Sequence, residues 1–454
     1  MSADATAVVS AETTPSSLAR VLGLRQLVYI VIGTVIGSGI FIVPGAVLRQ
    51  SGGSVGVALL VWLVGGILSM LGALTYAELG AMHPKAGGLY IYIRDGFGPF
   101  AAFLFGWTLF FVIGAGSVAT LAVAFVAYLG QLVPMGPVVS RVVAVGLIGV
   151  IAVVNVRGTR DSARLQGWTT LLKVAGILLL SGLLLLRGRG LHLEGAALWP
   201  PALSGQVLSG FGLAMIGTLW AYEGWQYVTY AAGDAEDPQR TFPRGIILCT
   251  GALIGIYLLA CVAYLAALGP ARVAASDRVA AEAATALFGP AAGKFVALMI
   301  LISIFSAANG IVLTVPRAFF AMARDGVFFR RLAEVHPRFG TPAVAIVASS
   351  LWAMLLAATG TFEQLLTYVV FIGWVFYGLG ALSVFSYRRR EPLTPRPFRV
   401  PGYPVTPILF VGSAAAIVIN TVISQPGRAA VGFGVMLLGS PAYLIWRSRR
   451  ERPQ

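Results

Sequence analysis

Charged residues are scarce in this chain. Only 11% of its 454 residues are Asp, Glu, Lys or Arg, whereas 58% are hydrophobic and the mean hydropathy is +0.86. A soluble domain of this length carries about 25% charged residues, which it needs to cover its surface. The shortage excludes a soluble protein and predicts that lipid surrounds most of the chain.

Cysteine and histidine are also rare, with 2 and 3 copies. Cys249 and Cys261 lie in one apolar segment, about 18 Å apart along a helix, which excludes a disulfide framework and predicts two small core residues. The histidines lie far apart, in loops or at the ends of apolar segments: His83, His192 and His336. Because no cluster of metal ligands, nucleotide-binding loop or activated nucleophile is present, the sequence predicts no metal site, no cofactor and no enzymatic activity.

Long apolar segments are what the chain has instead. A membrane-crossing helix needs roughly 20 apolar residues, and twelve segments meet this requirement. They lie at about 26–48, 56–82, 99–131, 138–156, 165–187, 205–232, 244–268, 293–325, 342–359, 364–387, 404–423 and 429–447. We therefore predict an all-α polytopic membrane protein with twelve transmembrane helices. Residues 1–20 are polar and are predicted to be a disordered cytoplasmic tail, not a cleaved signal peptide.

The net charge of +15 comes from basic residues whose positions along the chain indicate the membrane topology. With a cytoplasmic N-terminus, most Lys and Arg residues fall on the cytoplasmic side, including Arg388, Arg389 and Arg390, as the positive-inside rule requires. Aromatic residues are not interleaved with this basic excess, which argues against nucleic-acid binding. We predict a multi-pass protein of a bacterial-type inner membrane with both termini cytoplasmic. Glu78, at the cytoplasmic end of the second segment, is expected on a solvated face.

Two of the segments are interrupted by glycines and polar residues. The first contains Gly33–Phe41 (GTVIGSGIF), and the sixth contains Gly217–Trp225 (GTLWAYEGW). Open backbone is tolerated at membrane depth only where it is buried in protein or lines a cavity, and paired interruptions indicate a transporter site. Breaks in segments one and six predict two inverted repeats of five helices, at 21–190 and 200–390, followed by two further helices at 400–450. The alternative is that the glycines only allow close helix packing.

Five motifs resemble the amino acid–polyamine–organocation (APC) superfamily, in particular its bacterial L-amino-acid carriers and the light chains of heteromeric amino acid transporters. The resemblance covers residues 20 to 450 and rests on Gly33–Phe41, Ala86–Tyr92, Ala221–Trp225, Glu236–Ile246 and Pro316–Gly326. It implies a 5+5 inverted-repeat fold with a central site between unwound helices 1 and 6. It also implies sodium-independent exchange or proton-linked uptake of amino acids.

Eukaryotic members of this family have a cysteine after the third helix that bonds a heavy chain. The corresponding loop here, Leu132–Arg141 (LVPMGPVVSR), has none, so no covalent heavy-chain partner is expected. Whether the protein is a monomer or a homodimer stays open.

The first break suits the carboxylate of an amino acid. A half-helix that begins after the break points free N–H groups and the positive end of its dipole toward an anion. We therefore expect Gly37, Ser38 and Gly39 to bind the carboxylate, with the Ser38 hydroxyl as a further donor.

The substrate ammonium needs acceptors, and the resemblance implies the carbonyl groups of Val35, Trp220 and Ala221. It also implies that Trp220 closes the site toward the outside, although simple packing is the alternative. Glu223 stands where many eukaryotic relatives have glycine. It could bind a basic substrate, accept a proton or brace the unwound backbone.

Lys173 is the one Lys or Arg well inside a predicted span. A charged Lys at mid-membrane costs at least about 2.5–3.5 kcal/mol, and Lys173 lies about 12 Å from the helix start at Leu165, which argues against snorkelling to the headgroups. The resemblance implies that its amine replaces the sodium ion of sodium-coupled cousins by bridging segments one and eight. We expect Ser306 as an acceptor and a link between Lys173 and proton-coupled transport.

Two charged stretches face the cytoplasm in this topology. We expect the Glu236–Arg244 run to interact with the cluster of Arg317, Arg324 and Asp325 and to form the inward gate. Neutralising Asp237 or Arg324 would test this gate. A purely structural network is the alternative.

The function predicted from these features is sodium-independent secondary transport of small neutral L-amino acids by alternating access. Basic amino acids or polyamines are the alternative substrates, because of Glu223. A channel is disfavoured since the special residues are paired within one chain, whereas channels place selectivity rings on symmetric subunits. Exchange and proton symport both remain open.

Overall fold

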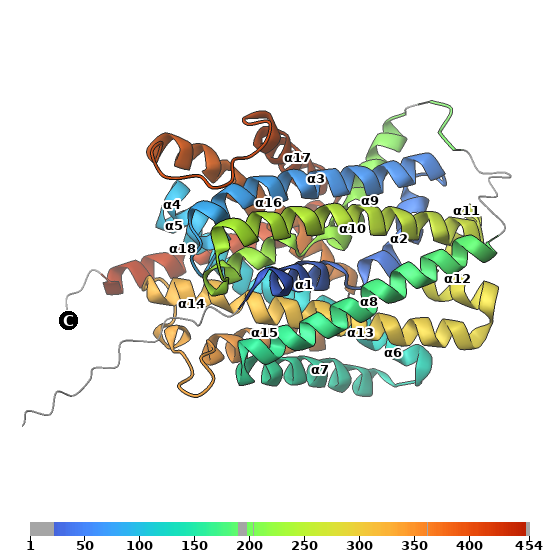
Figure 1. Ribbon diagram of the computed structural model, residues 1–454, viewed down its shortest axis with the longest axis horizontal. Coiled ribbons are helices and arrows are strands. Elements are labelled where there is room, and N and C mark those ends of the chain that lie inside the picture. Colours follow the sequence, from blue (N-terminus) through green and yellow to red (C-terminus); the bar gives the residue numbers. More distant parts are fainter. Residues whose placement is uncertain (1–21, 189–197, 203, 361, 451–454) are drawn as a thin grey trace, which may run out of the picture.

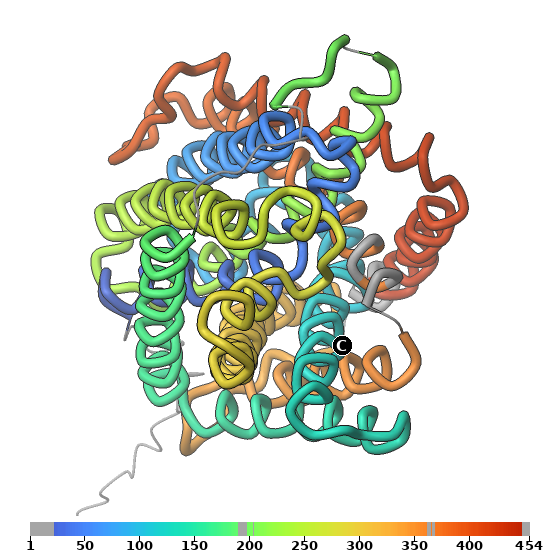
Figure 2. Tube along the Cα trace, turned by 90° about the vertical axis from the view of Figure 1, so that its right-hand side faces the viewer, coloured from blue at the N-terminus to red at the C-terminus, as the bar shows by residue number. Residues whose placement is uncertain are grey.

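The computed structural model describes residues 22–188, 198–202, 204–360 and 362–450. The predicted tail at 1–20 and His192 lie outside these residues. The described chain is helical, apart from turns, loops and one isolated bridge between Leu22 and Ala235. Most helices run along the long axis of the molecule in Figure 1, and Figure 2 shows many of them end-on. The all-helical prediction is confirmed.

The first half of the chain holds the helices from α1 to α8. Their bounds are α1 Leu24–Val35, α2 Gly39–Gln50, α3 Val55–Met82, α4 Leu89–Phe97, α5 Pro99–Thr108, the π-helix η1 Leu109–Gly114, α6 Ala115–Leu132, α7 Pro137–Arg157 and α8 Thr159–Arg187. The second half holds α9 Gly205–Tyr222, the 3-10 helix η2 Trp225–Asp234, α10 Pro238–Leu268, α11 Pro270–Ala275, α12 Val279–Phe288, α13 Pro290–Thr314, α14 Pro316–Arg324, η3 Arg330–Ala333, α15 Ala343–Thr359, α16 Phe362–Arg390, α17 Val405–Ser424 and α18 Pro426–Arg450.

Nine helical stretches of the described chain are long and apolar enough to span a membrane, and α1 with α2 forms a tenth span bent by 43°. Two of the predicted segments fall outside this set. The segment at 205–232 is α9 followed by η2, and the segment at 342–359 is α15, which has 17 residues. The polytopic architecture is therefore established, whereas the count of twelve and the inverted repeat stay predictions.

Glycine followed by proline marks several helix starts. Gly269 and Gly289 have φ angles of 75° and 86°, which glycine adopts without strain, and Pro270 and Pro290 then begin α11 and α13. Proline suits this first helical position because its missing N–H would have no intrahelical acceptor there. These junctions turn the chain sharply between α10 and α13.

The centre of the molecule is formed by the helices that carry the predicted motifs. The span made of α13 and α14 is 78% buried inside the protein, whereas α7, at the lower edge of both overall views, is 22% buried. Helix α1 packs against α8, α10 and α13. The first break therefore lies in the interior and not at the lipid-facing surface. Cys249 and Cys261 are buried, which confirms them as core residues.

The prediction that Glu78 lies on a solvated face is wrong, because its side chain is 0% exposed. Its carboxylate forms a two-point ion pair with Arg388 at 2.6 and 2.8 Å, and the backbone N–H of Val400 donates to it at 2.7 Å. Arg396 approaches to 3.5 Å. The end of α16 and the following loop fold over the end of α3, and these partners are more than 300 positions away in the sequence.

Candidate substrate site

The first predicted break is confirmed. Helix α1 ends at Val35, α2 begins at Gly39, and the backbone between them leaves helical geometry. Within the described chain, the N–H groups of Ser38 and Gly39 donate no backbone hydrogen bond, because they stand at the start of α2. These free donors point to where an anion would be stabilised.

The second predicted break is confirmed as well. Helix α9 ends at Tyr222, and Gly224 has a φ angle of 131°, which only glycine adopts easily, before η2 begins at Trp225. The backbone of this break is held by Gln226, whose side-chain oxygen accepts from the N–H of Gly224 at 3.1 Å. The sequence did not indicate this role for Gln226.

The two breaks touch each other, and glycine makes this contact possible. A Cβ on Gly39 would lie 2.6 Å from Cα of Ala221, and a Cβ on Gly224 would lie 2.9 Å from the backbone nitrogen of Val35. Real Cβ atoms do not approach other atoms so closely. The glycines therefore bring the main chains of the two breaks into direct contact.

The carbonyl groups expected to hold an ammonium converge at this contact and already accept hydrogen bonds. The oxygen of Val35 accepts from the N–H of Gly37 at 2.8 Å, so Gly37 presents no free backbone donor. Tyr257 on α10 places its hydroxyl 3.1 Å from the oxygen of Val35 and 2.9 Å from that of Ala221. The oxygen of Trp220 accepts from the N–H of Glu223 at 3.1 Å. A carbonyl oxygen has two lone pairs, so those of Trp220 and Ala221 can each accept once more, whereas that of Val35 already accepts from Tyr257 and Gly37. Tyr257 was missed at the sequence level, where it reads as an ordinary aromatic residue of an apolar helix.

Glu223 is buried, with 8% of its surface exposed. One carboxyl oxygen accepts from the hydroxyls of Tyr377 at 2.8 Å and Tyr227 at 3.0 Å, and more weakly from Gln226 at 3.4 Å. The other oxygen, Oε2, has no hydrogen-bond partner among the residues that the structure describes. Glu223 is thus held on one side by two tyrosines and keeps a free acceptor on the other.

A small cavity of about 20 Å³ lies between the breaks. It is lined by Thr34, Val35, Gly37, Ser38, Gly39, Ser117, Leu121, Trp220, Glu223, Tyr227 and Ile311. The hydroxyl of Ser38 is buried and, like Oε2 of Glu223, lacks a partner within the described chain. This volume holds about one water molecule, so the site is in a closed form. Unpaired buried polar groups cost about 1–3 kcal/mol each, which a ligand that paired with both would recover.

Lys173 occupies the interior position predicted for it. Its amine donates to the carbonyl oxygens of Gly33 at 2.5 Å, Ile36 at 2.6 Å and, at 3.4 Å, Ser303, and it is 2% exposed. Lys173 therefore joins α8 to the first break and to α13.

The prediction that Ser306 accepts a hydrogen bond from Lys173 is wrong. Its hydroxyl accepts from Thr169 at 2.9 Å, whereas Ser303, about one turn earlier on the same face of α13, meets Lys173. The Ser303 hydroxyl also donates to the carbonyls of Ile36 at 3.0 Å and Gly37 at 3.2 Å. Sequence periodicity gives the face of a helix but not its height relative to a neighbouring helix.

The Glu236–Arg244 run was expected to interact with the cluster of Arg317, Arg324 and Asp325, but no ion pair joins the two in the described part of the chain. Arg317 instead pairs with Asp234 at 2.6 Å, and both side chains are 1% exposed. Asp234 lies at the end of η2, just before the run, so the contact joins the second break to α14.

The other charged residues of this region make different contacts. Asp325 accepts from Arg94 at 2.6 Å and from Tyr90 at 2.8 Å. Arg324 lies over the ring of Phe320, and Asp237 has a φ angle of 42° at the start of α10. Neither Arg324 nor Asp237 joins an ion pair with a described residue. Their role in gating stays a prediction.

Comparison with known proteins decides the family. The family model of amino acid permeases matches residues 22–445. The chain belongs to this family. It is 33% identical over 444 residues to the serine/threonine exchanger SteT of Bacillus subtilis (strain 168), covering 96% of this chain and 99% of that protein. The resemblance to the APC superfamily is confirmed, and the chain is a multi-pass membrane protein of an amino acid transporter family.

Two mammalian relatives show how broad the related substrates are. The chain is 32% identical over 448 residues to the large neutral amino acids transporter small subunit 2 of Homo sapiens, covering 96% of this chain and 82% of that protein. It is 31% identical over 430 residues to the b(0,+)-type amino acid transporter 1 of Rattus norvegicus, covering 93% and 87%. These relatives are transporters by name, not enzymes.

Proposed function

We propose that this permease is a sodium-independent secondary transporter of small neutral L-amino acids that works by alternating access. The observation that carries the proposal is the meeting of the two breaks around one closed cavity. Free N–H groups of Ser38 and Gly39 and the Ser38 hydroxyl would bind the substrate carboxylate. The carbonyls of Trp220 and Ala221 would accept from its ammonium, and that of Val35 would do so in exchange for its hydrogen bond with the Tyr257 hydroxyl. Main-chain groups recognise what all amino acids share, and the walls of the site select among side chains.

The preference for small side chains follows from the crowded walls of the cavity. The large side chains of Leu121, Trp220, Tyr227 and Ile311 line it and leave little room for a long substrate side chain. In this proposal Trp220 moves to admit the substrate and closes over it afterwards. The name of the serine/threonine exchanger SteT agrees with small substrates.

Independence from sodium is supported by the contacts of Lys173. A sodium ion is bound by oxygen ligands, and the carbonyls of Gly33, Ile36 and Ser303 form such a set, but the amine of Lys173 already lies among them. The amine would take the place of the ion and would tie transport to the proton state of Lys173. Exchange or proton-linked uptake would then drive the cycle.

Basic amino acids are the second candidate, and one specific observation favours them. Oε2 of Glu223 is a buried acceptor that lines the cavity and has no partner in the described chain. The cationic end of a long side chain would find a counter-charge there. The name of the b(0,+)-type relative fits this alternative.

The proposed setting is the cell inner membrane, with cytoplasmic termini and no nucleic-acid partner. We also propose that no heavy chain is attached covalently, although one relative is named as a small subunit. The loop between α6 and α7 holds no cysteine, and both cysteines are buried in α10.

Counterflow in proteoliposomes tests the proposal. Purified protein loaded with unlabelled serine or alanine should accelerate uptake of the labelled amino acid, equally in sodium and in choline buffer, whereas a channel would show no trans-stimulation. A thermal-shift screen with all amino acids then ranks substrates. Stabilisation by solutes other than amino acids alone would overturn the substrate class, and stabilisation by arginine and lysine alone would favour the alternative.

A further inference from the structure

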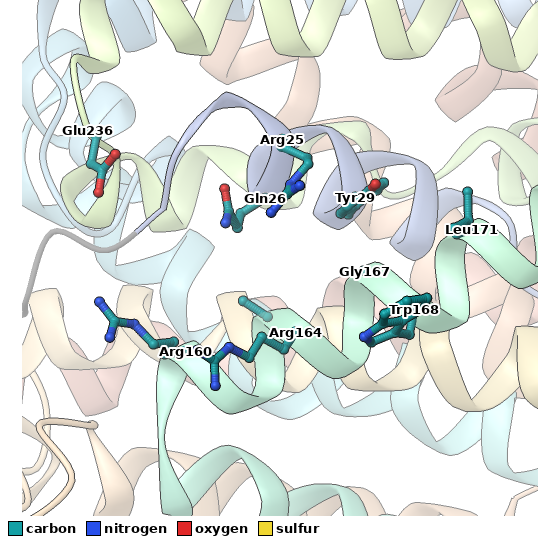
Figure 3. A pocket seen from close by; sticks show the side chains of 10 residues that line it. Arg25, Gln26, Tyr29, Arg160, Arg164, Gly167, Trp168, Leu171 and Glu236 are labelled. Atoms are coloured by element: carbon teal, nitrogen blue, oxygen red, sulfur yellow. The ribbon is translucent and has the colours of Figure 1, made fainter.

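A groove of about 560 Å³ lies between the starts of α1 and α8, outside the substrate site. Figure 3 shows its residues on three elements. Arg25, Gln26 and Tyr29 come from α1, Arg160, Arg164 and Trp168 from α8, and Glu236 closes one end. Its lining shares no residue with that of the cavity between the breaks.

Helices α1 and α8 close the floor of the groove. A Cβ on Gly167 would lie 2.9 Å from the ring of Tyr29, and the hydroxyl of Thr170 donates to the carbonyl of Tyr29 at 3.1 Å. The two helices are therefore in direct contact below the arginines. The groove is a surface feature that does not continue into the cavity at the breaks.

The groove carries an excess of positive charge that the described protein does not neutralise. Arg25 and Arg160 form no ion pair with any described residue, and Arg164 has only an exposed pair with Asp161 at 3.7 Å. Exposed pairs of this kind contribute little. Against three guanidinium groups the lining offers one carboxylate, that of Glu236. Arg160 and Arg164 also stand in the first turns of α8, where the helix dipole favours an anion.

The character of the groove changes along its length. Arg160 lies at the start of α8, and Trp168 and Leu171 follow toward the middle of the membrane, with 75% and 51% of their surfaces exposed. Arg160 and Leu171 are about 16 Å apart along the helix. A charged end followed by an apolar wall matches a glycerophospholipid, with its phosphate at the arginines and the start of its chains along the tryptophan.

We propose that this groove binds the phosphate of an anionic phospholipid from the cytoplasmic leaflet. Guanidinium groups bind phosphate oxygens in pairs of parallel hydrogen bonds, and basic pockets between membrane helices on the cytoplasmic side suit such headgroups. The amphipathic lining selects a lipid over a free phosphate ion. A phosphate that contacts Arg25 and Arg160 together would hold α1 against α8.

Lipid retention tests the proposal with the full-length protein. Wild-type protein is placed in nanodiscs of phosphatidylcholine mixed with phosphatidylglycerol. The protein is then released from the nanodiscs in the mass spectrometer, and the lipids that stay bound to it are counted. The double variant R160Q/R164Q should retain at least about tenfold less phosphatidylglycerol, because each basic residue near the surface contributes substantially to anionic lipid binding. R330Q/R331Q is the matched control, since it also removes two exposed arginines, but from η3 outside the groove.

Two further arms complete the test. Glu236→Gln removes the one acid of the groove and should raise phosphatidylglycerol retention about two- to threefold, a gain that a damaged fold would not produce. Inorganic phosphate added to the sample should not displace the lipid, whereas displacement would identify a phosphate-ion site and overturn the lipid proposal. Equal retention by R160Q/R164Q and R330Q/R331Q would overturn it as well. Neither result depends on the amino acid that is transported.

Discussion

The two breaks are held in different ways. At the first, the amine of Lys173 and the hydroxyl of Ser303 donate to the carbonyls of Gly33, Ile36 and Gly37, so two side chains from other helices fix the backbone. At the second, hydroxyl and amide groups hold the chain, and the carboxyl oxygen Oε2 of Glu223 stays free of described partners. The difference teaches that two similar interruptions can rest on different side-chain support. In the proposed function, main-chain groups of both breaks bind the part that all amino acids share, and the second break adds a carboxylate that would meet a variable side chain.

The largest effect is expected from removing the buried amine of Lys173. Lys173→Ala leaves the buried carbonyl of Gly33 without its side-chain donor, which costs about 1–3 kcal/mol. It also removes one of the two donors to Ile36 and one of the ties between α1 and α8. We expect counterflow to fall at least about tenfold and the melting temperature to drop. Lys294→Ala, which removes an exposed lysine at the start of α13, is the control and should behave as wild type.

The pH profile of uptake sharpens this prediction. If Lys173 links transport to protons, the residual activity of Lys173→Ala should depend less on pH than that of wild type. An undiminished rate with an unchanged pH profile would rule out the role of Lys173 in both fixing the break and coupling.

A second large effect is expected where the breaks touch. Gly39→Val adds a side chain whose Cβ would lie 2.6 Å from the Cα of Ala221, so the two breaks must separate. We expect transport to be lost although the protein still inserts into the membrane. Gly146→Ala on α7, where a Cβ meets nothing within 4 Å, is the matched control and should leave transport unchanged. Transport by Gly39→Val at the wild-type rate would contradict the direct contact.

Glu223→Gln tests the second break and should change selectivity more than rate. The variant keeps the size of the side chain but removes its charge, so uptake of serine and alanine should change less than about threefold. Uptake of arginine, measured in the same liposomes, should fall at least about tenfold if the wild type carries it. An equal loss for neutral and basic substrates would show that the carboxylate supports the fold and does not contact side chains.

The smallest effect is expected from Tyr257→Phe. Its hydroxyl is shared by the carbonyls of Val35 and Ala221, and its loss should cost about 1 kcal/mol of stability and raise the KM modestly. Tyr264→Phe is the control on the same helix, because that buried hydroxyl has no partner among the residues described and its removal should be neutral. Thermal unfolding of both variants checks the comparison, and equal melting temperatures would mean that the Tyr257 hydroxyl contributes nothing.

Local features of the fold were predictable from the sequence. Clustered glycines marked both breaks, because glycine is the residue that lets backbone leave a helix and approach another backbone. The buried, partnered position of Lys173 was predictable because it is a lone lysine in an apolar segment, and an ionisable group at membrane depth is too costly to keep without partners. Each of these signals is contained within a few consecutive residues.

Contacts between distant segments were not predictable in the same way. Ser303 meets Lys173 in place of Ser306, and Asp234 pairs with Arg317 in place of the neighbouring Glu236–Arg244 run. Choosing between such candidates requires the relative height and rotation of packed helices. Those depend on the shapes of many side chains at once, and one sequence does not display them.

The buried ion pair of Glu78 has a consequence for how the protein is made. The carboxylate belongs to α3, but Arg388 and the N–H of Val400 emerge from the ribosome only after more than 300 further residues. Until then the end of α3 carries a charge without its partners. The early part of the chain therefore cannot reach its final packing during synthesis, and fragments that stop before residue 388 should be degraded rather than accumulate.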